Sequence, residues 1–154
     1  MTDASASDRT PGVAVAVISF NTRDILRDCL TSVLAESPTE LVVVDNGSTD
    51  GSIEMVRQAF PSARLVVEAS NPGYGAASNR AVSECSSSYV FLLNSDTVLP
   101  PGTLDAMRGY MERHPRAGMA GPRLVNADGS LQPSCFAFPS ATFLQPCASA
   151  NDWR

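Results

Sequence analysis

The chain has 154 residues, of which 44% are hydrophobic and 18% charged, a composition typical of one globular domain with a core of ordinary size. Eleven basic residues stand against sixteen acidic ones, so the formal net charge is −5 and the basic surface that nucleic acids require is absent. The apolar runs are far shorter than the roughly 18 residues that span a bilayer, which excludes an integral membrane segment in this sequence.

Short apolar runs alternate with helical patterns along the chain. Residues 1–12 have neither the basic nor the apolar region of a secretion signal, and we expect a disordered tail there and a cytoplasmic protein. Strands are predicted at 13–18, 41–44, 65–67 and 89–93. Helices are predicted at about 22–34, 53–60, 75–85 and 104–114. This alternation predicts an α/β fold with a doubly wound, mostly parallel sheet and helices on both faces.

The pattern changes near the end of the chain. Residues 121–125 predict a further strand, 126–129 a hairpin turn, and 133–154 an irregular tail, so we expect one domain over 13–132. The cysteines lie far apart, without the spacing of zinc or redox motifs, and reduced structural thiols are expected at Cys29, Cys85, Cys135 and Cys147.

Polar residues follow three of the predicted strands. Asn21 comes after the first strand, Asp45 and Asn46 after the second, and residues 94–96 after the fourth. In an open parallel sheet, ligands bind beyond the carboxyl ends of the strands, close to the point where the strand order reverses. We therefore expect a binding site at this edge.

Asp45 has two interpretations. Its carboxylate is suited to accept a hydrogen bond from the N3–H of uracil or thymine while Phe20 packs on the base. Alternatively, Asp45 caps the turn that it forms with Asn46 and Gly47, a common use of Asp at the end of a strand.

Asp96 is suited to hold Mg²⁺ or Mn²⁺, because these cations prefer oxygen ligands and take few protein carboxylates. Asn94 stands where a second acid would strengthen such a site, so modest affinity in the absence of nucleotide is expected. The alternative is that Asp96 is a turn residue.

A dinucleotide-binding site is a competing interpretation of residues 73–78, which half-match G-x-G-x-x-G/A. That fingerprint belongs to the first strand–helix turn of its unit, whereas this segment follows a complete βαβα pattern. The placement argues against a nicotinamide or flavin site.

Four segments together resemble family 2 glycosyltransferases, and the resemblance covers about residues 13–134. They read VISFN at 17–21, VVVDNGSTDGS at 42–52, NPGYGAASN at 71–79 and LLNSDT at 92–97. GPRL at 121–124 with DGSLQ at 128–132 is similar to the rhamnosyltransferase-like branch of the family.

The resemblance implies a GT-A type, Rossmann-like fold and a role for each matching residue. Asp96, with Asn94, would bind the Mg²⁺ or Mn²⁺ ion. The residues that would bind the nucleotide sugar are Phe20, Asn21, Asp45, Asn46, Gly73, Asn79 and Ser95.

The resemblance also implies a reaction. The enzyme would transfer a sugar, with inversion, from a dTDP- or UDP-sugar, and dTDP-rhamnose is the first candidate donor. The acceptor would be a cell-surface glycan or a lipid-linked molecule in cell wall polysaccharide biosynthesis. Such an enzyme works in the cytoplasm or at the inner face of the plasma membrane. The general base is expected beyond Arg154, in an acceptor-binding half that the sequence lacks. The alternative is a non-catalytic, nucleotide-sugar-binding remnant.

Overall fold

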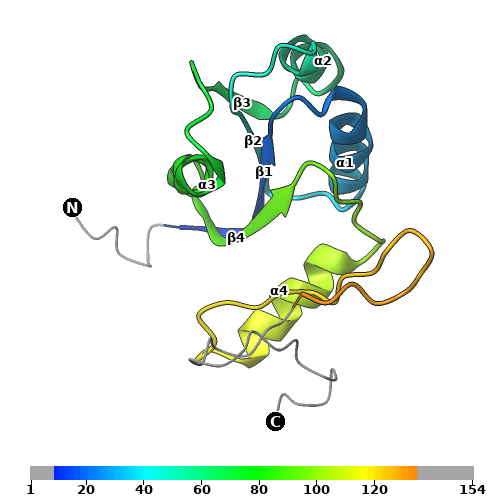
Figure 1. Ribbon diagram of the computed structural model, residues 1–154. Coiled ribbons are helices and arrows are strands. Elements are labelled where there is room, and N and C mark those ends of the chain that lie inside the picture. Colours follow the sequence, from blue (N-terminus) through cyan, green and yellow to red (C-terminus); the bar gives the residue numbers. More distant parts are fainter. Residues whose placement is uncertain (1–8, 135–154) are drawn as a thin grey trace, which may run out of the picture. The chain divides into compact units, whose positions relative to one another are not determined.

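The computed structural model describes residues 9–134, which fall into two compact units divided between His114 and Pro115. The first unit contains all the named helices and strands (Figure 1). In chain order they are β1 (Thr10–Ser19), α1 (Arg23–Ala35), β2 (Glu40–Asp45), α2 (Ser52–Ala59), β3 (Arg64–Val67), α3 (Tyr74–Ser83), β4 (Ser87–Asn94) and α4 (Thr103–Arg113).

The four strands form one parallel sheet in the order β3-β2-β1-β4. From β1 the chain first winds outward to β2 and β3, and it then returns to place β4 on the other side of β1. The order therefore reverses between β1 and β4, which is the kind of position where open α/β sheets bind ligands. The predicted doubly wound fold is confirmed.

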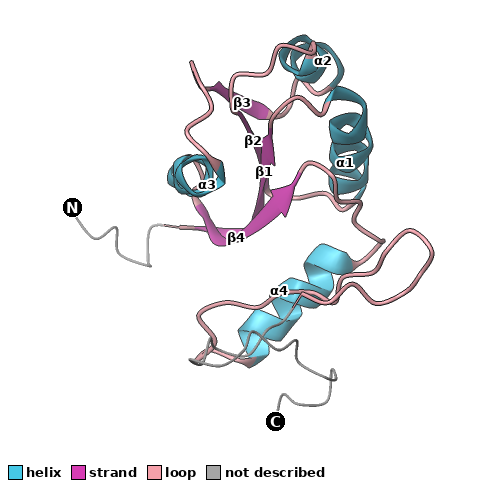
Figure 2. Ribbon diagram, in the orientation of Figure 1, coloured by secondary structure: helices cyan, strands magenta, loops and turns pink. Residues whose placement is uncertain are grey.

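Helices cover both faces of the sheet (Figure 2). Successive residues of a strand point to opposite faces, so Val15 and Val17 of β1 pack with buried residues of α1 and α2, whereas Ala16 and Ile18 pack with α3. The α3 side has small side chains, including Ala77 of the helix, and small residues allow a helix to lie close to a sheet. This brings the start of α3 near the carboxyl ends of the strands.

The start of α4 is bound to the end of α1. The Glu36 carboxylate accepts hydrogen bonds from the backbone N–H groups of Gly102 (2.8 Å) and Leu104 (3.0 Å). The first N–H groups of a helix have no partner inside the helix, so a carboxylate placed there accepts their hydrogen bonds. Its negative charge also interacts favourably with the positive end of the helix dipole. Ser32 of α1 also accepts a hydrogen bond from the Leu99 N–H at 3.0 Å.

The structure corrects the predicted start of β1. The strand begins at Thr10, which pairs with Ser87 of β4, and the register shifts between Thr10 and Val13. Gly12, in this shifted segment, has a φ of +139°, and a Cβ atom there would collide with the Thr39 side chain. Residues 10–12, which were expected in the tail, therefore belong to β1. Residues 1–8 of the predicted tail lie outside the described part of the chain.

The second unit, described over residues 115–134, contains the predicted turn but not the predicted strand at 121–125. Asn126 donates to the Ser130 carbonyl at 2.8 Å, and Gly129 donates back to the Asn126 carbonyl at 2.9 Å. Pairing is limited to a single antiparallel bridge between Val125 and Leu131, which is too short to form a strand. The predicted tail at 135–154 lies outside the described residues.

No helix within residues 9–134 has both the length and the apolar character needed to cross a membrane.

Candidate functional site

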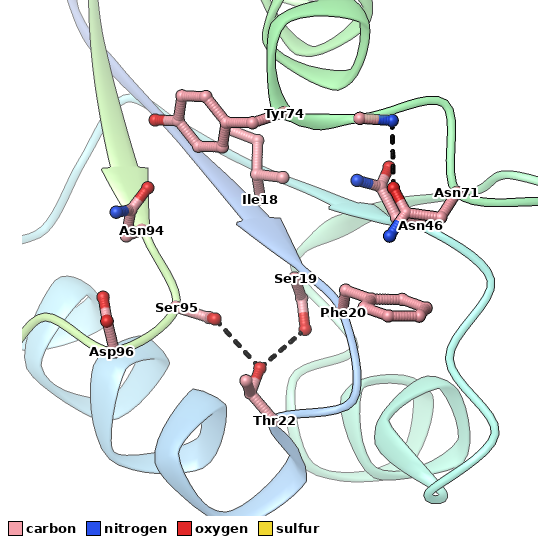
Figure 3. A pocket seen from close by; sticks show the side chains of 11 residues that line it. Ile18, Ser19, Phe20, Thr22, Asn46, Asn71, Tyr74, Asn94, Ser95 and Asp96 are labelled. Atoms are coloured by element: carbon pink, nitrogen blue, oxygen red, sulfur yellow. Dashed lines mark hydrogen bonds between the residues drawn. The ribbon is translucent and has the colours of Figure 1, made fainter.

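A pocket of about 370 Å³ opens at the carboxyl ends of β1 and β4, where the strand order reverses (Figure 3). Its volume falls within the range of about 300–1,000 Å³ that is common for small-molecule sites. The lining residues come from the ends of three strands and from the start of α3: Ile18, Ser19, Phe20, Thr22, Asn46, Asn71, Gly73, Tyr74, Asn94, Ser95 and Asp96.

The end of β4 supplies the charged side of the pocket. Asn94 pairs with Ile18 of β1 as the last residue of β4, and Asn94 and Asp96 are both exposed and line the pocket. Asp96 is the only carboxylate among the lining residues. Asp96 and Asn94 thus offer hard oxygen ligands to a cation, and diphosphate and water are the usual source of the remaining ligands of Mg²⁺. Within residues 9–134, no group of three or more His, Cys, Asp or Glu forms a metal site without such help.

Three hydroxyl groups join the ends of β1 and β4. The Thr22 hydroxyl donates to Ser95 Oγ at 2.9 Å, and it forms a second hydrogen bond with Ser19 Oγ at 3.1 Å (Figure 3). Ser19 is 1% exposed and Ser95 is 7% exposed. The hydroxyl chain therefore fixes Ser95, one of the predicted binding residues, beside Asp96.

Asn46, which comes directly after β2, is the polar residue of that strand end that lines the pocket. It is 3% exposed, and its Oδ1 atom has no hydrogen-bond partner among the described residues. Buried polar atoms in proteins are nearly always hydrogen-bonded, so this oxygen is a ready acceptor for a donor group on a ligand. In Figure 3, Asn46 and Phe20 lie on one side of the pocket, and Asn94 and Asp96 lie on the other.

Asp45 ends β2, and its predicted contact with a base stays a prediction, since its Oδ2 atom has no hydrogen-bond partner among the described residues. The residue is 1% exposed and is absent from the pocket lining. Its Oδ1 accepts a hydrogen bond from the Ser48 N–H at 2.7 Å, the turn-capping geometry of the alternative interpretation. Asp45 and Asp96 do share the carboxyl edge of the sheet: Asp45 ends β2, Asp96 lies just after the end of β4, and these two strands flank β1.

Asn21 also supports the site from outside the pocket lining. Its φ is +53°, a left-handed conformation that Asn tolerates better than most residues do. Its backbone N–H donates to Ser48 Oγ (2.8 Å), and its Oδ1 accepts from the Thr49 N–H (2.9 Å). The loop after β1 is thereby bound to the loop after β2. Asn21 is exposed, and its Nδ2 group makes no hydrogen bond among the described residues, so its contact with the donor stays a prediction.

The start of α3 closes another side of the pocket. Gly73, a predicted binding residue, lines it and caps the helix with a φ of +88°, while its N–H donates to Asn71 Oδ1 at 2.9 Å. Tyr74, the next residue, is 51% exposed and also lines the pocket. Asn79, predicted to bind the nucleotide, is exposed on α3 but is not part of the pocket lining.

Sequence reasoning did not single out five of the lining residues. Thr22 is only the start of a predicted helix, and Tyr74 and Asn71 lie inside a motif without a role of their own. Ser19 and Ile18 belong to the strand that the apolar pattern identified, and their place at its carboxyl end was the available signal. The five residues are Ile18, Ser19, Thr22, Asn71 and Tyr74.

Comparison with known proteins gives one consistent result. The model of glycosyl transferase family 2 matches residues 14–134. The N-acetylglucosaminyl-diphospho-decaprenol L-rhamnosyltransferase of Mycobacterium tuberculosis is 35% identical over 120 residues, which are 71% of this chain and 39% of the relative. The chain thus spans about two fifths of that relative's length.

Solved structures agree on the fold. The mannosyltransferase PcManGT of Pyrobaculum calidifontis, in complex with GDP-Man and Mn²⁺, has a TM-score of 0.60 and 26% identity, covering 66% of this chain and 33% of its own. TarS of S. aureus in complex with UDP-GlcNAc has a TM-score of 0.59 and 23% identity, covering 72% of this chain and 37% of its own.

Proposed function

Because the chain belongs to glycosyl transferase family 2, we propose that it forms the nucleotide-sugar-binding part of a glycosyltransferase. The observation that carries the proposal is the pocket at the reversal of strand order. It combines one exposed carboxylate, Asp96, with one buried acceptor, Asn46 Oδ1, that has no partner within residues 9–134. The two residues are on opposite sides of the pocket, as the two ends of a nucleoside diphosphate would require (Figure 3).

The base of the nucleotide is bound at the side formed by Asn46 and Phe20. Uracil and thymine present an N–H donor between two carbonyl groups, and an amide offers both an acceptor and a donor to such an edge. Phe20 is 44% exposed, so its ring is free to pack against a base. In this proposal Asp45 and Asn21 hold the loops beside Asn46, and the contact of Asn79 with the nucleotide stays a prediction.

The diphosphate is bound at the side formed by Asp96 and Asn94. Their oxygen atoms would hold Mg²⁺ or Mn²⁺ together with phosphoryl oxygens and water. When bound, the cation would stabilise the negative charge that builds up on the departing diphosphate. The PcManGT structure is a complex with both GDP-Man and Mn²⁺, which supports a divalent cation of this kind.

The whole enzyme transfers the sugar by direct displacement, with inversion at the anomeric carbon. A dTDP-sugar or UDP-sugar is the donor, and dTDP-rhamnose is the first candidate because the Mycobacterium tuberculosis relative is a rhamnosyltransferase. The name of that relative also specifies a decaprenol-linked molecule, which supports a lipid-linked acceptor. We propose that the acceptor, or a cell-surface glycan in its place, is reached at the inner face of the plasma membrane. Among residues 9–134 we assign no general base.

The second candidate is a protein that binds a nucleotide sugar without transferring it. The observation in its favour is that Asp96, which the cation needs, is the only carboxylate lining the pocket within residues 9–134, so this part of the chain offers no second acid there to accept a proton. Incubation with dTDP-rhamnose and with UDP-sugars distinguishes the two candidates. Release of dTDP or UDP above the uncatalysed rate contradicts the binding-only candidate, whereas tight binding without release supports it.

Isothermal titration with dTDP and UDP, with and without Mn²⁺, tests the binding site itself. We expect binding that tightens in Mn²⁺, and we expect Asp96→Ala to remove that tightening. Asp28→Ala is the matched control, because Asp28 is an exposed aspartate of α1 that does not line the pocket. If Asp96→Ala responds to Mn²⁺ as the wild type does, the assignment of Asp96 as cation ligand is wrong.

A further inference from the structure

The hydroxyl chain of Ser19, Thr22 and Ser95 has a direction of hydrogen-bond donation. Each hydroxyl group has one proton to donate, together with lone pairs that accept. The Thr22 proton is used in the hydrogen bond to Ser95, so the hydrogen bond between Ser19 and Thr22 must use the Ser19 proton. The order is thus from Ser19 to Thr22 to Ser95, and the Ser95 proton has no acceptor among the described residues.

The Ser95 hydroxyl, whose proton has no acceptor among the described residues, lies at the pocket. Ser95 lines the pocket and is 93% buried, between the two predicted cation ligands Asn94 and Asp96. A donor whose oxygen already accepts a hydrogen bond is polarised by it, and donation to a charged oxygen is stronger than donation to a neutral one. An anionic acceptor therefore fits this position best.

Thr22 does not have the role that its position in the sequence predicts. It occupies the N-cap of α1, where a Thr hydroxyl usually accepts a hydrogen bond from a backbone N–H of the first turn. No such hydrogen bond forms, and the hydroxyl is directed to Ser95 instead. The side chain thus stabilises the position of Ser95 in the pocket rather than the start of its own helix.

We propose that Ser19 and Thr22 are positioning residues that orient the Ser95 hydroxyl as a hydrogen-bond donor to a phosphoryl oxygen of the bound nucleoside diphosphate. The inference rests on the proposed function, because it needs a diphosphate in this pocket. Asp96 and Asn94 would hold a cation together with phosphoryl oxygens, next to the loop that carries Ser95. The hydroxyl chain then adds a contact that is specific for phosphate and that a nucleoside lacks.

The test compares nucleotides with nucleosides across a set of variants. Thr22→Val removes the hydroxyl and keeps the shape of the side chain, Thr22→Ser restores the hydroxyl, and Ser95→Ala removes the final donor. Thr31→Val is the matched control, since Thr31 lies on the exposed side of the same helix, where its hydroxyl bonds the Arg27 carbonyl. The probes are dTDP, UDP, thymidine and uridine, each titrated in Mn²⁺.

We expect Ser95→Ala to weaken the binding of dTDP or UDP roughly tenfold, as the loss of a hydrogen bond to a charged group predicts. Thr22→Val should weaken it by roughly threefold or more, while Thr22→Ser and Thr31→Val stay within about twofold of the wild type. Thymidine and uridine should bind all of these variants equally. If Thr22→Val does not fold, Thr22→Ala and Ser19→Ala interrupt the same chain with smaller side chains.

Two results overturn the hydroxyl chain alone: unchanged diphosphate binding in Thr22→Val or Ser95→Ala, or equal losses for diphosphates and nucleosides, which would indicate a merely structural effect. A wild-type protein that binds neither dTDP nor UDP contradicts the proposed function, and with it the hydroxyl chain. The two failures are therefore distinguishable.

Discussion

Asp45→Ala and Asn46→Ala are expected to have opposite effects, although the two residues are adjacent at the end of β2. Asp45 is buried behind the pocket and accepts a hydrogen bond from the Ser48 N–H at 2.7 Å. Asn46 faces the pocket, and its Oδ1 has no partner among the described residues. Asp45 Oδ2 also lacks a partner among the described residues, but only Asn46 lines the pocket. We therefore expect the first side chain to stabilise the fold and the second to bind a ligand.

The magnitudes follow from these contacts. Asp45→Ala leaves the buried Ser48 N–H without a partner, which costs about 1–3 kcal/mol of the free energy of unfolding. For a domain of roughly 150 residues that loss lowers Tm by about 3–10 °C. Asn46→Ala breaks no hydrogen bond made by its Oδ1, so stability should change by less than about 1 kcal/mol. Binding of dTDP or UDP should weaken roughly five- to thirtyfold, the equivalent of about 1–2 kcal/mol in lost hydrogen bonds.

Thermal and urea unfolding of the nucleotide-free proteins, followed by titration with dTDP and UDP, measures both quantities. Asp45→Asn is the control, because its amide oxygen still accepts from the Ser48 N–H and should recover most of the lost stability. The reasoning is refuted if Asp45→Ala keeps the wild-type Tm and loses nucleotide binding. That result would mean that Asp45 contacts the base directly.

Three further predictions concern the rest of the fold. Glu36→Ala should lower the free energy of unfolding by about 1–2 kcal/mol and speed hydrogen exchange in α4, because the N–H groups at the start of that helix lose their acceptor. Burial raises the pKa of Glu40, but hydrogen bonds from Ser87 and Ser86 outweigh it and lower the pKa below the usual 4.5. The stability that this lowered pKa provides is present above pH 4.5 and is lost as the pH falls through the lowered value, so Glu40→Gln should flatten the acid limb of a pH titration of stability. Burial raises the pKa of the Cys29 thiol to about 12, so alkylation at pH 8 followed by peptide mass mapping should find Cys29 unmodified until the protein unfolds.

The sheet was predictable because its strands are local patterns. Each apolar run became a strand within three residues of the predicted limits, since a strand buried on both faces needs unbroken apolar sequence. The start of β1 was not predictable, because Pro11 and Gly12 have the sequence of a turn. Their place in the sheet depends on pairing between Thr10 and Ser87, residues far apart in the chain. Likewise, residues 121–125 have strand-like sequence but only a single bridge as partner.

The site was predictable at the level of the edge but not of the individual side chain. Polar residues after apolar strands identified the carboxyl end of the sheet, and six of the nine predicted binding and metal residues line the pocket. Of the other three, Asn79 is an exposed residue of α3, and the placement of Asp45 and Asn21 depends on conformations that the sequence leaves open. A step of one residue at the end of β2 decides whether Asp45 or Asn46 faces the pocket, and the left-handed φ of Asn21 directs its amide to a neighbouring loop.

The hydrogen bonds between the loops that follow β1 and β2 limit how far one of these loops can be replaced by the loop of a relative. Asn21 bonds both Ser48 and Thr49, and the Arg23 N–H donates to the Asp50 carboxylate at 2.9 Å. A chimera that imports one loop from a relative with another nucleotide preference would leave these donors and acceptors unmatched. Grafting a new specificity therefore requires transplanting both loops as one cassette.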